Sequence, residues 1–145
     1  MKPFKLICIG LITIISSSCQ VISPLFVDYY DVRMDVAEWI NHQQLLSMKQ
    51  KHFLVQLSKA QQKLYKVETK QEGQRVQIIK ENMITMHCAE QYISKHKIEQ
   101  LQNKIFNPDE KKQILDFYNE QRQKVNIDLN SVKCGGLGSE PMLEL

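Results

Sequence analysis

The feature that most restricts the fold is a long stretch of chain almost free of helix-breaking residues. Between Val27 and Pro108 there is no proline and a single glycine, Gly73. Glycine and proline end helices most often, although a lone glycine inside a helix costs only about 1 kcal/mol. The stretch therefore predicts long helices, with the first turn at Gly73.

Apolar residues in this stretch recur at the spacing of a packed helix. One row repeats every seven residues and a second row interleaves with it. Together they form one seam, as in a coiled coil or an elongated bundle. Glutamines interrupt the second row, which we interpret as partly solvated positions in the bundle. The first row is Val32, Trp39, Leu46, Phe53, Ala60 and Val67; the second is Val36, Leu57 and Leu64, interrupted by Gln43, Gln50 and Gln71.

The segment from Asn107 to Glu110 is a strong helix start, with Asn as N-cap, Pro at the first helical position and acidic residues after it. We predict an all-α fold, an elongated antiparallel three-helix bundle with coiled-coil-like packing. Its helices are expected over about 28–70, 74–106 and 108–130, within a bundle domain at 28–133. The glycine-rich remainder, 134–145, is predicted to be a flexible tail.

The N-terminus has the three parts of a secretory signal peptide: a short basic segment, a mostly apolar run at 6–15 and small residues at 16–18. We expect residues 1–18 to be removed after export. The alternative is an uncleaved anchor over 6–27. A membrane-spanning helix needs about 20 mostly apolar residues, and this one would contain four serines, a glutamine and a proline.

The segment Ile15-Ser16-Ser17-Ser18-Cys19 resembles the lipobox of bacterial lipoproteins. In that class the cysteine is acylated and becomes the first residue of the mature chain. The resemblance implies a lipid on Cys19, a tether over 19–27 and a place in the cell envelope. Gln20 is the type of residue that lets such lipoproteins reach the outer membrane, with the inner membrane as the other destination. Ser16 stands where the class prefers Leu, and an ordinary signal peptidase would also accept this segment.

The cysteine count supports the same interpretation. Once Cys8 leaves with the signal peptide, Cys19, Cys88 and Cys134 remain, an odd number in an oxidising compartment. If Cys19 is acylated, the other two can pair, and we predict a Cys88–Cys134 disulfide. In the alternative, Cys88 is a small buried hydrophobic residue on a helix and Cys134 is a free thiol.

Charge and motifs narrow the function. Loss of the signal peptide leaves 17 of the 19 basic side chains against 16 acidic ones. A nearly neutral chain lacks the positive surface that nucleic-acid binding needs. The sequence contains no nucleotide-binding glycine loop, no nucleophile elbow and no paired metal motif. We therefore expect no enzyme activity, no cofactor, no metal and no nucleic-acid partner.

Two functions remain. We expect a membrane-anchored helical interaction protein, a scaffold or accessory subunit that binds another envelope protein. The alternative is a periplasmic chaperone-like or ligand-carrying module. That module would use adaptable methionine side chains on an open apolar face, namely Met34, Met48, Met83 and Met86.

Overall fold

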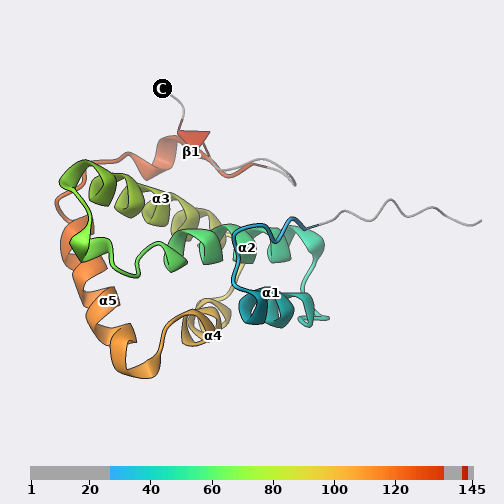
Figure 1. Ribbon diagram of the computed structural model, residues 1–145. Coiled ribbons are helices and arrows are strands. Elements are labelled where there is room, and N and C mark those ends of the chain that lie inside the picture. Colours follow the sequence, from blue (N-terminus) through green and yellow to red (C-terminus); the bar gives the residue numbers. More distant parts are fainter. Residues whose placement is uncertain (1–26, 136–141, 144–145) are drawn as a thin grey trace, which may run out of the picture.

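The structure, a computed structural model, describes residues 27–135 and 142–143. The predicted signal peptide, Cys19 and the tether up to residue 26 lie outside this part. The described chain is mostly helical (Figure 1), which confirms the predicted all-α class. Its α-helices are α1 (Met34–Asn41), α2 (Met48–Gln62), α3 (Glu72–Glu90), α4 (Lys95–Ile105) and α5 (Pro108–Arg122). Two short 3-10 turns, η1 (Val67–Thr69) and η2 (Leu129–Ser131), and the strands β1 (Val132–Lys133) and β2 (Met142–Leu143) complete it.

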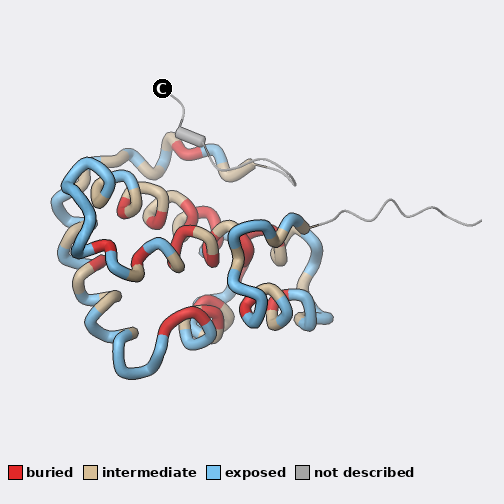
Figure 2. Tube along the Cα trace, in the orientation of Figure 1, coloured by how far each residue is buried: buried red, intermediate tan, exposed pale blue. Residues whose placement is uncertain are grey.

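Helix α2 lies at the centre of the fold. It contacts α1, α3 and α4, while α5 packs on α3 and α4 at one end of the molecule (Figure 1). Figure 2 shows buried residues on α2 and on the helices around it. Most of the side chains of α2 are buried: His52, Phe53, Leu54, Val55, Leu57, Ser58, Ala60 and Gln61. The core therefore surrounds one helix, instead of filling a seam between three long ones as the predicted bundle required.

The predicted helix over 28–70 is divided, because residues 42–47 leave the helical path before α2 begins. Ser47 starts α2 with a capping box. Its hydroxyl accepts a hydrogen bond from the backbone N–H of Gln50 at 3.2 Å, and the Gln50 side chain accepts from the N–H of Ser47 at 2.9 Å. The Gln50 amide also donates to the Tyr92 carbonyl at 2.9 Å. Gln50, which we interpreted as an interruption of the seam, is thus part of the cap that starts α2.

The seam residues are buried or half-buried although the helix between them is broken. Gln43, which was expected to be partly solvated, joins two helices. Its amide donates to the Trp39 carbonyl at 3.1 Å, and its oxygen accepts from the Lys97 ammonium at 2.9 Å. The seven-residue pattern therefore identified core residues correctly, but not a continuous helix.

The other two predicted helices also differ from the structure. The helix expected over 74–106 is two helices, because Ser94 caps α4 by accepting from the Lys97 N–H at 3.3 Å. A serine hydroxyl satisfies a free N–H at a helix start, so a new helix can begin without glycine or proline. The third helix begins at Pro108 as predicted, but it ends at Arg122, well before 130.

Gly73 does not form the first turn. It lies inside the first turn of α3, and the preceding connection bends where Lys66 takes a left-handed conformation with φ 61°. No heavy atom lies within 4 Å of the place where a Cβ on Gly73 would be. An alanine side chain would therefore fit there without strain.

We expect Gly73→Ala to raise the free energy of unfolding by up to about 1 kcal/mol, since alanine loses less backbone entropy than glycine in a helix. Urea unfolding followed by circular dichroism measures this change. Gln77→Gly, at an exposed position of the same helix, is the matched control and should lower stability by a similar amount. A destabilising Gly73→Ala would mean that Gly73 ends a helix after all.

The C-terminal residues return to α3. Cys134, which follows β1, is bonded to Cys88 of α3 with Cα atoms 5.3 Å apart, so the predicted disulfide is present. Part of the tail predicted to be flexible is a strand, because Leu143 and Met142 pair antiparallel with Val132 and Lys133. Residues 136–141 and 144–145 of that tail lie outside the described part. In 27–135 and 142–143, no helix has the length and apolar character to cross a membrane.

Candidate functional site

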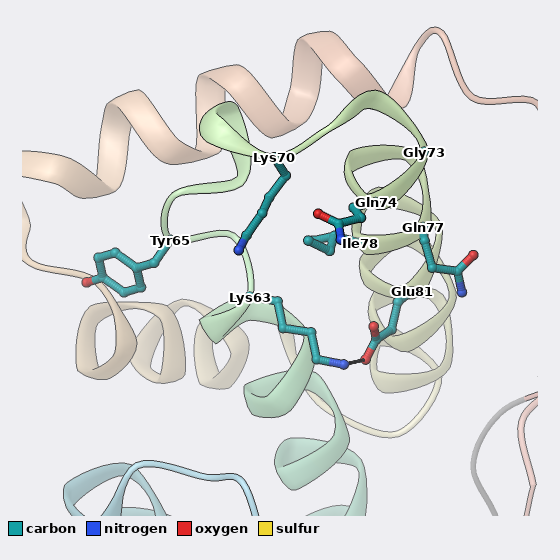
Figure 3. Close-up of a pocket in the computed structure, with 8 residues that line it drawn as sticks. All are labelled: Lys63, Tyr65, Lys70, Gly73, Gln74, Gln77, Ile78 and Glu81. Carbon is teal, nitrogen blue, oxygen red and sulfur yellow. Dashed lines mark hydrogen bonds and ion pairs between the residues drawn. The ribbon is translucent and has the colours of Figure 1, made fainter.

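The strongest candidate for a binding site is a groove of about 690 Å³ between α3 and the connection that leads to it from α2 (Figure 3). In Figure 3, Gln74 and Ile78 point into the groove from α3, and Lys70 reaches toward it from the connection. The residues that line the groove are Lys63, Tyr65, Lys70, Gly73, Gln74, Gln77, Ile78 and Glu81. An apolar floor at Ile78 is thus surrounded by amide and charged groups.

An ion pair crosses one end of the groove. The Lys63 ammonium lies 2.6 Å from a carboxylate oxygen of Glu81, and both side chains are partly exposed. A second hollow of about 550 Å³ shares these two residues and continues toward Asp28 and Tyr30 near the start of the described chain. Because an exposed ion pair contributes little to stability, a ligand that replaced either partner could open one hollow into the other.

Tyr65 is held in place at the opposite side of the groove. Its hydroxyl donates to the carbonyl of Ile105 at 3.0 Å and accepts from the backbone N–H of Asn107 at 3.0 Å. The Arg33 guanidinium also donates to the Ile105 carbonyl, at 3.0 Å. These bonds satisfy backbone groups at the corner between α4 and α5, where a helix end has free carbonyls. Tyr65 is therefore part of a rigid corner.

Arg33 adds a charged contact at that corner. Its guanidinium donates two hydrogen bonds to the Asp35 carboxylate, at 2.6 and 2.9 Å. These bonds hold the pKa of the Asp35 carboxyl below its ordinary value and raise the pKa of Arg33. A cation beside the last carbonyls of α4 also complements the negative end of that helix. We assign Arg33 a structural role that ties the segment before α1 to α4.

The side chains that line the groove are of types that can bind a ligand. Its amides, ammonium groups and carboxylate can form hydrogen bonds and ion pairs with a polar or charged partner, and Ile78 offers apolar contact. The arrangement can recognise a partner that carries both polar and apolar groups.

The histidines are separated. His42 contacts the Glu38 carbonyl at 2.7 Å, and His87 contacts the Gln91 amide at 3.1 Å. His52 is buried on α2. No group of three or more histidine, cysteine, aspartate or glutamate residues in the described ranges is arranged to hold a metal ion. Cys88 and Cys134 are bonded to each other, and Cys19 lies outside those ranges.

The methionines proposed for an open apolar face are divided between two environments. Met83 and Met86 are half-buried and pack against the core. Met34 and Met48 are exposed, at 83% and 39% of their surface. Half of the side chains on which the carrier hypothesis depends are thus engaged in the core of the domain.

The groove residues were not predicted as a group. Lys63 and Lys70 fall within the helix expected over 28–70, whereas they lie on the connection between α2 and α3. No sequence pattern marks the groove, because it exists only where that connection crosses α3. Comparisons of the chain with protein-family models, with curated proteins and with solved structures found no match.

Proposed function

We propose that this chain is an exported bacterial lipoprotein, anchored through an acylated Cys19 to the outer membrane on its periplasmic side. Its helical domain serves as an interaction or accessory module for another envelope protein. The inner membrane is the second possible site of anchorage. The observation that carries the proposal is the pairing of Cys88 with Cys134.

That pairing supports the proposal in two ways. A disulfide persists in an oxidising compartment such as the periplasm, which agrees with the signal-like N-terminus. It also accounts for two of the three cysteines that follow the signal segment, which leaves Cys19 as the remaining one. Cys19 stands at the position that is acylated in the lipoproteins whose lipobox this segment resembles.

The interaction role is supported by the side chains that line the groove. Its groove offers amide, ammonium and carboxylate groups beside an apolar floor, a combination that suits the polar and apolar groups of another polypeptide. A lipid anchor would keep this groove close to other envelope proteins and raise their effective concentration. Crosslinked envelopes that yielded lipid but no partner protein would contradict this role.

The anchor is tested by Cys19→Ala in the full-length chain expressed in a Gram-negative host. We expect the wild type to incorporate labelled palmitate and to give a mature N-terminal peptide with the mass of an acylated Cys19. The variant should incorporate no label and stay uncleaved or be released from the membrane, because its thioether attachment point is missing. Membrane fractionation and mass spectrometry measure both results.

The control is the double variant Cys88→Ala/Cys134→Ala, which removes the two paired thiols and keeps Cys19. It should be acylated like the wild type. An unmodified mature N-terminus in the wild-type protein would show that an ordinary signal peptidase processes the chain, and the lipoprotein proposal would be wrong.

A further inference from the structure

The second hollow, beyond the Lys63–Glu81 ion pair, contains charged side chains that have no partner. Its volume is about 550 Å³, and it is lined by residues of the segment before α1, of α2 and of α3. Among the residues that the structure describes, the Lys59 ammonium and the Asp31 carboxylate line this hollow without forming a hydrogen bond or an ion pair. The hollow therefore presents charges of both signs to a molecule that enters it.

Lys59 is the basic group of the hollow that the fold leaves uncompensated. It is half-buried on α2. Lys63 follows four residues later, so both side chains project from the same face of the helix. Lys63 has an acidic partner, because its ammonium lies 2.6 Å from a carboxylate oxygen of Glu81 (Figure 3). The carboxylate of a ligand would give Lys59 the partner that Glu81 gives Lys63, through a charge-assisted hydrogen bond.

The acidic groups of the hollow lie on the segment before α1, which is held in a fixed position. Gln62 of α2 binds this segment twice: its oxygen accepts from the Arg33 N–H at 2.9 Å, and its amide donates to the Asp31 carbonyl at 3.2 Å. The Asp28 carboxylate accepts from the N–H of Tyr30 at 2.9 Å. Because these bonds already order the main chain beside both carboxylates, a ligand would not lose affinity by ordering it.

The charges of the hollow define a matching ligand. It carries an ammonium group for Asp28 or Asp31 and a carboxylate for Lys59. Lys63 and Glu81 neutralise each other, so the two remaining carboxylates exceed the remaining ammonium by one. The best match is therefore a molecule with two ammonium groups and one carboxylate.

Two uncharged groups in the hollow favour a peptide among such molecules. The Gln56 amide offers both a donor and an acceptor, which is the complement of a peptide group. The ring of Tyr30, which is exposed, offers apolar contact to a side chain. The volume of the hollow lies in the range of small-molecule sites, so the bound peptide is short.

We propose that the second hollow binds short peptides whose two ends are free, and that it binds those with one basic side chain most tightly. The α-ammonium and the basic side chain lie against Asp28 and Asp31, and the terminal carboxylate lies against Lys59. This site is separate from the lipid anchor proposed above and does not depend on it.

Calorimetric titration of the purified full chain with the tripeptide Lys-Ala-Ala tests the site. The same tripeptide with an amidated C-terminus lacks the carboxylate, and with an acetylated N-terminus it lacks the terminal ammonium. We expect Lys-Ala-Ala to bind saturably. Each blocked form should bind about tenfold more weakly, which is the scale of one hydrogen bond between charged groups.

Two variants assign these contacts to the hollow. Lys59→Gln should weaken the binding of Lys-Ala-Ala about tenfold and leave that of the amidated form unchanged, because this form lacks the carboxylate that Lys59 contacts. Asp31→Asn should remove the difference between Lys-Ala-Ala and its acetylated form. Asparagine tolerates the left-handed conformation of Asp31 (φ 63°), so this variant should fold normally, which circular dichroism checks.

The matched control is Lys95→Gln, which makes the same charge change at an exposed position of α4 and should leave the affinity unchanged. Equal losses in Lys59→Gln and Lys95→Gln would mean that the overall charge of the protein attracts the peptide, and the inference would be wrong. Equal binding of the free and blocked peptides, or no saturable binding of Lys-Ala-Ala up to about 10 mM, would also overturn it.

Discussion

Replacing Leu57 with alanine is expected to lower the free energy of unfolding by about 2 to 5 kcal/mol, the range for removing a large aliphatic side chain from a core. Leu57 is fully buried at the centre of α2, the helix around which the core forms. Its loss would leave a cavity between α2 and its neighbours, because a helix held on several sides cannot move to fill the space. Urea or thermal unfolding of the purified domain measures the effect.

The neighbouring residue provides a matched control. Gln56 lies on the same turn of α2 but is only half-buried and lines an open hollow, so Gln56→Ala should change stability by less than about 0.5 kcal/mol. Phe53→Ala should resemble Leu57→Ala, since Phe53 is 3% exposed and its ring stacks on Tyr92 with centroids 4.5 Å apart. Similar losses at positions 53, 56 and 57 would show that α2 does not have the burial described above.

Reducing the Cys88–Cys134 disulfide is expected to have a comparable effect. The bridge joins residues 46 apart in sequence, and a closed loop of that length contributes about 4 kcal/mol in the chain-entropy model. A change of this size should lower the melting temperature by more than about 10 °C in a domain of this length. Thermal unfolding by circular dichroism, with and without a reducing agent, measures the shift.

The double variant Cys88→Ala/Cys134→Ala separates the bridge from other effects of the reducing agent. It should melt near the temperature of the reduced wild type and should not respond to reduction. The segment that returns from α5 through η2 to β1 packs on the core through Val125, Leu129 and Val132, and the disulfide is its covalent link to α3, so we expect this segment to be the first part to detach when the bridge is reduced. Two free thiols in the oxidised mature protein would contradict the disulfide and, with it, the main support for the proposed compartment.

The contrast between Gly73 and Ser47 explains why the helix boundaries were partly mispredicted. Glycine was taken as the signal for a turn, yet Gly73 lies in α3, where its missing side chain costs little. Ser47 and Gln50 have the Ser-x-x-Gln spacing of a capping box. That signal was present in the sequence, but Gln50 was interpreted as an interruption of a continuous seam.

The residues of the candidate binding groove could not be predicted as a group from the sequence, for a different reason. Lys63 and Lys70 are close to one another in sequence, but Glu81 and Ile78 reach the same hollow only because α3 folds back beside α2. The proposed lipid anchor, in contrast, was inferred from the sequence. Its direct evidence is a contiguous segment that ends at Cys19, outside the residues that the structure describes, and the structure adds only the pairing of Cys88 with Cys134.

The sequence by itself determined the all-α class, the apolar residues of the seam that are buried, the start of α5 at Pro108 and the pairing of Cys88 with Cys134. Each of these follows from local chemistry: apolar spacing, a residue without an N–H at a helix start, and two cysteines that are left to pair once Cys19 is assigned to the proposed lipid. Only the tertiary structure decided that the chain breaks at 42–47 and 91–94. A serine cap can begin a new helix or be carried through an old one at similar cost. Packing decides between them, because breaks at these places let α1, α3 and α4 all contact α2 and bury its apolar side chains.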